Sequence, residues 1–462
     1  MSKLQELRSQ CYTPNIIECP YNSNKNPVIN CDIIGSGYCN KKIDNILESI
    51  KGTYSNTHSN NNNGQWMSKL IKDSREILRN HFNVNDNYVV LFNGSGFTGA
   101  VNHLCHSMKV DNTWTVFITE NEHNSNILPW VESGANVVVI ETEPMTNLIK
   151  PESLEFYFTH YQSKNNLFAC NLGNNVSGVI QDYKTIYKIT RKYNVKLFLD
   201  CAMVAPYILI DANYCDALAF SPHKFYGGDQ TPGVLIARKE LFVNPKPFCP
   251  GGGSVRMISR NFNNVNVIYS NDIETRESSG TPNILGIIKI GLIIKLKENN
   301  IDYIHSRELY LTKMIYNFMR GLDNIRIIDI PDSVDIGTFN KIIQNRIPIV
   351  SFQVLHNGVP LHYNLIVKIL SDRFGILTRG GVQCCPLFAQ KYLHGKSIEN
   401  VQSKLLNDKG LDECYGFVRL SLNYLLTDSE IKKILEALQF ISKEAYKFSG
   451  YYNYNCKSNL FS

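Results

Sequence analysis

The feature that most constrains the fold of this chain is a regular alternation of short apolar runs with helical or glycine-rich segments between residues 88 and 237. Short apolar runs bounded by turn residues are typical of buried strands, and strands that alternate with helices favour a largely parallel sheet. The expected strands cover residues 88–92, 115–119, 137–141, 167–171, 196–199, 216–220 and 233–237, and one intervening helix covers 183–193. In such sheets the functional residues lie at the carboxyl ends of the strands.

Lys224 lies in the segment SPHKFYGGDQTPGVL, residues 221–235, between the last two of these apolar runs. Burial against an apolar sheet disfavours the ammonium form of a lysine, so its pKa falls and its amine becomes nucleophilic. An amine of this kind can form a Schiff base with an aldehyde cofactor. The alternative interpretation of Lys224 is a surface lysine on a turn.

Asp200 ends an apolar strand that is a poor environment for an unpaired carboxylate. A buried aspartate normally has a cationic partner, or it caps a helix that follows the strand. His123 and Asn175 also follow apolar runs, so the topology predicts that they lie at the same sheet edge as Asp200 and Lys224.

The segment NGSGFTGAVNHL, residues 93–104, is rich in glycine and continues from a strand into a helix. Backbone amides at a helix N-terminus bind anions, and glycines let the chain approach a phosphate closely. The segment has neither the Rossmann glycine spacing nor the Walker lysine, which disfavours nucleotide binding.

These motifs, together with Gly-Thr-Pro-Asn at 280–283 before a long apolar helix, resemble the class V pyridoxal-phosphate enzymes. That family contains cysteine desulfurases, selenocysteine lyases and some aminotransferases. The resemblance extends over nearly the whole chain. It implies an α/β fold of the type I pyridoxal-phosphate class, with a large domain built on a mostly parallel sheet and a smaller C-terminal α/β domain.

The resemblance also implies roles around pyridoxal 5′-phosphate. Lys224 would be the catalytic Schiff-base lysine, and Ser221, His223 and Thr98 would help to hold the phosphate. His123 would stack on the ring and take part in catalysis, Asp200 would pair with the pyridine nitrogen, and Asn175 would lie near the phenolic oxygen and the substrate. Thr281 would reach the phosphate of another subunit, which implies a homodimer with shared active sites.

Arg379 begins the segment RGGVQCCPLF in the C-terminal half. A guanidinium offers a planar fork to a carboxylate, and the family uses an arginine here to bind the substrate. Cys384 matches the nucleophilic cysteine of the desulfurases, although a cysteine doublet by itself is often inert. Met203 departs from the pattern, because desulfurases usually carry a glutamine three residues after the aspartate.

The first functional hypothesis is a desulfurase that converts L-cysteine to L-alanine and keeps the sulfur as a persulfide on Cys384, with a sulfur-acceptor protein as a further partner. The second is a class V aminotransferase or another amino-acid lyase in which Cys384 is not catalytic, and Met203 favours it. A third is a non-catalytic dimeric scaffold, against which the retained Lys224, Asp200 and His123 argue.

Composition and charge argue against several other classes of function. The thirteen cysteines show no disulfide-type or zinc-type spacing and the N-terminus has no apolar leader, so a reducing, cytoplasmic setting and no metal site are expected. The net charge of +6 is scattered, which argues against nucleic acid. The longest apolar stretch, 284–296, is interrupted by Lys289 and Lys295 and is too short for a membrane span.

The expected organisation is an irregular N-terminal segment (1–27), a large cofactor-binding domain (28–285), a small C-terminal domain with its linking helix (286–450) and a loosely packed tail (451–462). A short strand is expected over 28–34 and a helix over 67–82. The glycine turn after residue 248 is expected to open into a polar, mobile stretch that reaches about residue 271.

Overall fold

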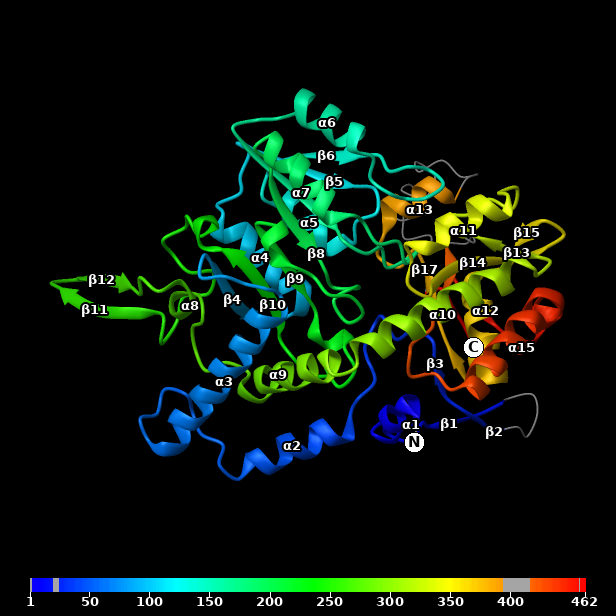
Figure 1. Cartoon of the computed structure of the whole chain (residues 1–462), viewed down its shortest axis with the longest axis horizontal. Helices are drawn as coiled ribbons and strands as arrows, with labels where there is room; N and C mark the ends of the chain where they lie inside the picture. Colours follow the sequence, from blue (N-terminus) through cyan, green and yellow to red (C-terminus); the bar gives the residue numbers. More distant parts are fainter. Residues whose placement is uncertain (1, 20–24, 394–415, 457) are drawn as a thin grey trace.

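A seven-stranded sheet forms the centre of the larger half of the molecule in the computed structural model, which describes residues 2–19, 25–393, 416–456 and 458–462 (Figure 1). Its order is β4-β10-β9-β8-β7-β5-β6. The strands are β4 (Tyr88–Asn93), β5 (Trp114–Thr119), β6 (Asn136–Ile140), β7 (Asn165–Asn171), β8 (Lys196–Asp200), β9 (Ala217–Phe220) and β10 (Gly233–Arg238). Strands β6, β5, β7, β8 and β9 pair in parallel, as the alternation of strands and helices predicts.

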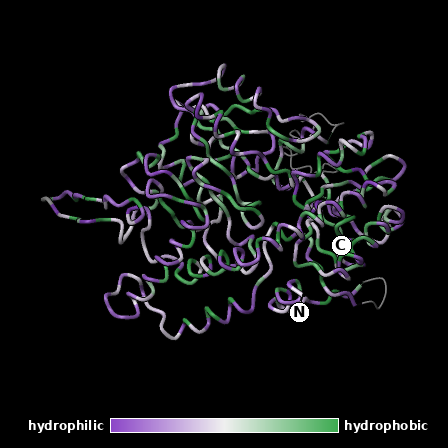
Figure 2. Tube along the Cα trace, viewed as in Figure 1, coloured by the Kyte–Doolittle hydropathy of each residue, from purple (hydrophilic) through white to green (hydrophobic). Residues whose placement is uncertain are grey.

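Both faces of this sheet are buried, because side chains alternate along each strand. In β4, Tyr88 and Val90 join one core, and Val89 and Leu91 join another. The first core is covered by α3 (Asn62–His81), α6 (Pro151–His160), α7 (Tyr183–Lys192) and α9 (Ile284–Glu298). The second is covered by α4 (Gly96–Ser107) and α5 (Leu128–Glu132). Figure 2 shows the corresponding concentration of apolar residues along the interior of the chain trace.

Strand β10 runs antiparallel to both of its neighbours, β9 and β4. The chain reverses between β9 and β10 through the short helical turn η3 (Pro222–Lys224). Gly233 at the start of β10 pairs with Asn93 at the end of β4. The turn that carries Lys224 therefore lies beside the N-terminus of α4, which follows β4.

A second, wholly antiparallel sheet forms the smaller half, in the order β13-β14-β18-β17, with β15 paired to β14. Its strands are β13 (Ile325–Ile327), β14 (Ile349–His356), β15 (Val359–Pro360), β17 (Arg379–Gly381) and β18 (Phe417–Ser421). Its helices are α10 (Ile301–Arg320), α11 (Ile336–Gln344), α12 (Tyr363–Phe374), α13 (Pro386–Tyr392) and α15 (Asp428–Glu444). Helices α9 and α10 lead from the first sheet to the second (Figure 1).

The N-terminal residues are more ordered than the expected irregular segment. Helix α1 (Lys3–Ser9) begins with a capping box between Ser2 and Gln5, and β1 (Ile16–Glu18) pairs with β2 (Lys25–Pro27). The strand expected over 28–34 is only β3 (Ile29–Asn30), which pairs with β16 (Ile376–Leu377). Ile29 and Cys31 join the core of the C-terminal sheet, whereas Ile33 and Ile34 join the core of the larger sheet.

Three other segments differ from expectation. The stretch after residue 248 is not irregular but contains a hairpin of β11 (Val255–Asn261) and β12 (Asn264–Tyr269), which projects from the molecule (Figure 1). Helix α3 begins at Asn62, five positions before the expected start, because Asn61 caps it. The tail forms a small hairpin of β19 (Tyr454–Asn455) and β20 (Leu460–Phe461) that packs on His362.

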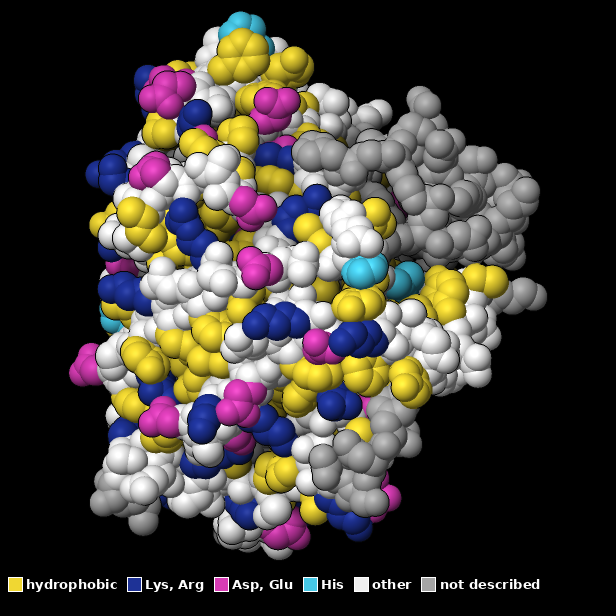
Figure 3. All heavy atoms as spheres, turned by 90° about the vertical axis from the view of Figure 1, so that its right-hand side faces the viewer, with side chains coloured by type: hydrophobic (Ala, Val, Ile, Leu, Met, Phe, Trp, Pro, Cys, Tyr) yellow, Lys and Arg dark blue, Asp and Glu magenta, His cyan; other side chains and the backbone are white. Residues whose placement is uncertain are grey.

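The remaining elements are α2 (Lys41–Lys51), α8 (Ile273–Arg276) and the short turns η1 (Asn124–Asn126), η2 (Ala212–Tyr214), η4 (Lys239–Leu241) and η5 (Ala445–Tyr451). Among the described residues, no helix combines the length and the apolar character needed to cross a membrane. On the face shown in Figure 3, basic and acidic side chains are interspersed with apolar ones.

Candidate active site

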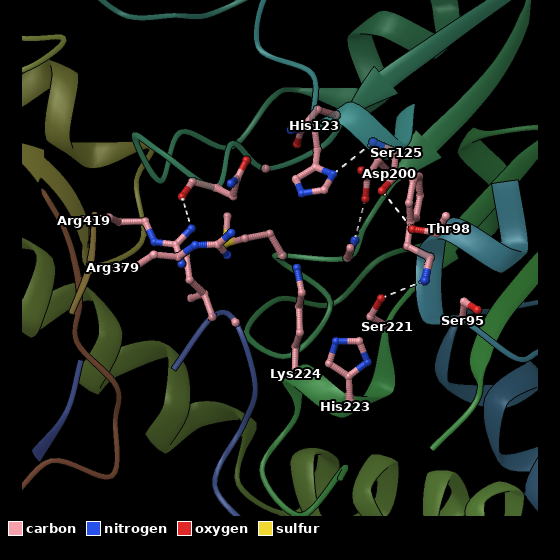
Figure 4. A pocket seen from close by; sticks show the side chains of 18 residues that line it. Ser95, Thr98, His123, Ser125, Asp200, Ser221, His223, Lys224, Arg379 and Arg419 are labelled. Atoms are coloured by element: carbon pink, nitrogen blue, oxygen red, sulfur yellow. Dashed lines mark hydrogen bonds between the residues drawn. The ribbon is translucent and has the colours of Figure 1, made fainter. Parts of the chain in front are cut away.

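A cavity of about 230 Å³ lies at the carboxyl ends of β7, β8 and β9, between the two sheets. Most of the residues that the sequence singled out line it: Thr98, His123, Asn175, Asp200, Ser221, His223, Lys224 and Arg379. Figure 4 shows Arg379 and Arg419 on one side of the cavity, Ser95, Thr98 and Ser221 on the other, and the Lys224 amine between them. Cys384 and Thr281, by contrast, are not part of the cavity lining.

Lys224 and Asp200 are two ionisable cavity residues whose pKa values are shifted by burial. Burial lowers the pKa of Lys224, Asp200 opposes that shift, and Arg419 and Arg379 add to it. Burial raises the pKa of Asp200 to about 6, against the backbone hydrogen bond from Ala202 and the charge of Lys224. Asp200 is therefore largely ionised at neutral pH, and Lys224 is easier to deprotonate than a lysine in water.

His123 follows β5 and extends into the cavity from above (Figure 4). Its Nδ1 accepts a hydrogen bond of 3.1 Å from the backbone N–H of Ser125. This contact places the proton of the neutral ring on Nε2. Burial lowers the pKa of His123 to about 4, helped by Lys224, Arg379 and Arg419, so the ring is neutral at physiological pH.

The N-terminus of α4 lies beside the turn that carries Lys224, and together they form one corner of the cavity, called the α4 corner below. Ser95, at the N-cap, makes no side-chain capping bond, and the backbone N–H of Phe97 donates to Ser221 Oγ at 2.9 Å. Gly96 has a φ of +58°, and a Cβ there would lie 2.9 Å from Ser221 Oγ. Glycine is therefore needed for this close approach of helix and turn.

Arg419 is a cavity residue that the sequence analysis missed. Its side chain, 2% exposed, lies on β18, and it contacts Asp32 through Nη2 and the backbone carbonyl of Asn175 through Nη1. Burial lowers its pKa, Asp32 opposes the shift, and Arg379 adds to it. An arginine inside the apolar run FVRLS was the available signal, because a buried cation requires a partner.

Cys384 contacts Arg379 and lies on the segment between β17 and α13. The Arg379 Nη2 donates to its Sγ at 3.6 Å, and its backbone carbonyl accepts from Asn124 N–H at 2.8 Å. Gln383 and Cys384 both have a φ of 58°. Left-handed backbone in non-glycine residues costs on the order of 1–3 kcal/mol each, so the surrounding contacts must hold this segment.

Thr281 lies on the surface of the large domain, just before α9. Its Oγ1 accepts a hydrogen bond of 2.9 Å from Asn56 Nδ2, and the neighbouring Gly280 carbonyl lies 3.3 Å from His58 Nε2. The polar loop around residues 56–58 is thus joined to the turn that carries Thr281.

A family model described as Aminotransferase class-V matches residues 36–434. The chain belongs to this family. Among the relatives of this class-V chain, a protein named "Probable cysteine desulfurase" from Borreliella burgdorferi is 30% identical over 326 residues, which are 68% of this chain and 72% of the relative. A "Cysteine desulfurase" from Wigglesworthia glossinidia brevipalpis is 27% identical over 345 residues, 69% and 73% of the two chains.

The class-V chain also resembles solved structures. The apo structure of a cysteine desulfurase from Thermococcus onnurineus NA1 aligns with a TM-score of 0.74 at 20% identity, over 96% of this chain and 99% of that one. A NifS-like protein from Rickettsia africae gives a TM-score of 0.69 at 22% identity, over 90% and 99%. The predicted family and the type I fold are therefore confirmed.

Class-V aminotransferases depend on pyridoxal 5′-phosphate, and the cavity of this chain fits that cofactor. The N-terminus of α4 with Ser221 suits a phosphate. The Asp200 carboxylate borders the cavity and suits a protonated ring nitrogen, and the Lys224 amine suits the aldehyde.

Proposed function

We propose that this chain is a pyridoxal-phosphate-dependent cysteine desulfurase that converts L-cysteine to L-alanine. The observation that carries the proposal is the contact between Cys384 and Arg379, because Arg379 also lines the cavity with Lys224. The desulfurase names of the curated relatives agree with it.

The bound cofactor supplies an aldehyde that captures an amino group and a ring that accepts electrons. Lys224 would hold it covalently, Asp200 would balance the charge of its ring nitrogen, and His123 would cover its ring. Thr98, Ser221 and His223, with the α4 amides, bind its phosphate. The family resemblance suggests these roles, and the gathering of the side chains around one cavity supports them.

Arg379 and Arg419 bind the carboxylate of the amino acid, with Asn175 as a third polar contact. Both arginines lie across the cavity from the α4 corner (Figure 4). A ligand that reaches from the arginines to this corner therefore passes Lys224. Planar guanidinium groups bind carboxylates in a defined orientation. The Lys224 amine, released when the amino group of the substrate takes its place, has a lowered pKa and would take the α-proton of the bound amino acid.

In the sulfur step, the Cys384 thiolate attacks the sulfur of L-cysteine and the carbon–sulfur bond breaks. The carbon side keeps the bonding electron pair and gains a proton, so the products are L-alanine and a persulfide on Cys384. The Arg379 guanidinium stabilises negative charge on the attacking sulfur. Atoms and electrons balance without another reagent, and a sulfur-acceptor protein then removes the outer sulfur.

Replacing Cys384 with serine tests this function. We expect the variant to lose most of its alanine formation from L-cysteine, because a hydroxyl cannot accept the sulfur as a persulfide. The measurement is alanine and sulfide released by the cofactor-loaded protein. The matched control is Cys249→Ser, an exposed cysteine before the hairpin. Full alanine formation by the Cys384 variant, or none by the native protein, would refute the proposal.

The second candidate is a class V aminotransferase or another amino-acid lyase in which Cys384 has no catalytic part. Met203 supports it, because desulfurases usually carry a glutamine at this position. In this chain the apolar Met203 side chain lines the cavity close to Gly173. In that case the Cys384 variant would remain active on an amino acid other than cysteine. Incubation with each amino acid and identification of the products separates the two candidates.

We also propose that the chain works as a homodimer in which Thr281 reaches the cofactor phosphate of the partner subunit. Thr281 is exposed and is not part of the cavity lining, and Phe262 on the projecting hairpin is 90% exposed. An isolated two-stranded hairpin is marginally stable in water, so a partner surface would stabilise it.

Replacing Thr281 with alanine is expected to weaken cofactor binding about tenfold or more, since a hydrogen bond to a charged phosphate is lost. Thr281→Ser keeps the hydroxyl and is the control. Cofactor titration gives the affinity, and sedimentation at micromolar concentration gives the assembly state. A monomer that keeps full cofactor occupancy would contradict the shared site.

Every cysteine that the structure describes is unpaired. This supports the proposal that the protein acts in a reducing compartment such as the cytoplasm.

A further inference from the structure

Cys385 is buried next to Cys384 and makes a contact of its own. Its Sγ lies 2.7 Å from Asn175 Oδ1, and its side chain is 0% exposed in a small core with Val176 and Phe388. Burial raises the pKa of the Cys385 thiol, so the sulfur stays protonated and acts as the donor. Neither cysteine is part of the cavity lining, and of the two it is Cys384 that contacts Arg379.

The Asn175 amide is fixed at both ends. Its Oδ1 accepts from Cys385, and its Nδ2 donates to the backbone carbonyl of Gln383 at 2.9 Å. Rotating the amide by half a turn would set its oxygen against that carbonyl and its N–H group against the thiol. The two contacts therefore select one orientation and leave the second N–H of Nδ2 for a ligand in the cavity.

The same amide holds the strained segment around Cys384. Gln383 and Cys384 have left-handed backbone, and such conformations persist only where neighbours enforce them. Asn175 binds residues on both sides of Cys384, namely Gln383 and Cys385. Two further contacts tie the doublet to the first half of the chain: Asn124 N–H donates to the Cys384 carbonyl, and Cys385 Sγ lies 4.0 Å from the Asn121 carbonyl, farther than from Asn175 Oδ1.

We propose that Cys385 is a positioning residue whose thiol orients the Asn175 amide toward the substrate carboxylate and, through that amide, fixes the position of Cys384. This rests on the proposed desulfurase function and deepens it, because it gives the two neighbouring cysteines different tasks. Cys384 takes the sulfur, and Cys385 donates a hydrogen bond without forming any covalent bond.

Kinetics of Cys385→Ala and Cys385→Ser test the proposal. The alanine variant is expected to raise the KM for L-cysteine and lower kcat, each by about three- to tenfold, because one buried hydrogen bond is lost. The serine variant restores both values, since its hydroxyl donates to the same oxygen. Cys215→Ala, which removes an equally buried thiol bonded to the Ala212 carbonyl, is the control and keeps native values.

A double variant shows whether Cys385 acts through Asn175. In an Asn175→Ala background, Cys385→Ala is expected to add little, because the thiol no longer has its acceptor. Fully additive effects, native kinetics in Cys385→Ala, or reduced thermal stability with unchanged KM and kcat would each overturn the proposal.

Alkylation of Cys384 by iodoacetamide gives a readout that needs no turnover. Mass spectrometry of the peptide that contains the doublet should show faster modification of Cys384 in Cys385→Ala and the native rate in Cys385→Ser. If the native protein forms no alanine from L-cysteine, the desulfurase function fails and this rate still decides the positioning role. Equal rates in all three proteins would overturn it.

Discussion

Replacing Lys224 with alanine is expected to lower turnover by roughly 10²–10⁴-fold from lost proton transfer alone. Lys224 lines the cavity, and burial lowers the pKa of its amine, which suits a group that must both hold an aldehyde and take a proton. The variant should also lose the covalent link, so borohydride should no longer fix the cofactor to the protein.

The matched control for this change is Lys239→Ala, which removes an exposed lysine just after β10. Its activity and its borohydride-fixed cofactor should equal those of the native protein. If borohydride still attached the cofactor to the Lys224→Ala variant, another lysine would hold it and the assignment would be wrong.

Replacing Asp200 with asparagine is expected to lower kcat by roughly 10²–10³-fold, because a preorganised charge is removed from a buried site. The carboxylate borders the cavity and accepts a backbone hydrogen bond of 2.9 Å from Ala202, which orients it. Asparagine has nearly the same shape and can keep that hydrogen bond through its oxygen. The loss therefore reports the charge and not the packing.

Steady-state kinetics and the absorbance of the bound cofactor measure this effect together. The variant should still bind the cofactor through the α4 corner, and the absorbance spectrum of the bound cofactor should change. Native kcat in a folded Asp200→Asn protein would exclude the role proposed for the carboxylate. Asp211→Asn, in the loop before η2, is a suitable control because that side chain lies outside the cavity lining.

Much of the sheet and the positions of Lys224, Asp200 and His123 were predictable, because their signals are local. Each expected strand is a short apolar run, and each of the three polar residues lies within four residues of the end of one. Parallel strands bring such residues to one edge, and the structure places all three on one cavity.

Arg419 and the hairpin could not be found in the same way. Arg419 becomes a cavity residue only because β18 lies beside β17 in the second sheet, a pairing between segments far apart in the chain. The hairpin strands carry Asn and Arg among their apolar residues, so their alternation looks like an irregular polar stretch. The capping box at Ser2 can be recognised in the sequence, but Pro14, Pro20 and Pro27 favour an irregular segment.

The antiparallel pairing of β10 with β4 and β9 determines which parts of the site can move apart. Because β10 pairs with both β4 and β9, the α4 corner and the lysine turn are attached to one main-chain ladder, and a Cβ on Gly233 would lie 2.0 Å from the Gly96 carbonyl. Arg379 and Arg419 belong to the other sheet. A hinge motion between the two sheets would move the two arginines away from Lys224 and the α4 corner, which would stay together. An amino acid could then enter and leave while the cofactor remains bound.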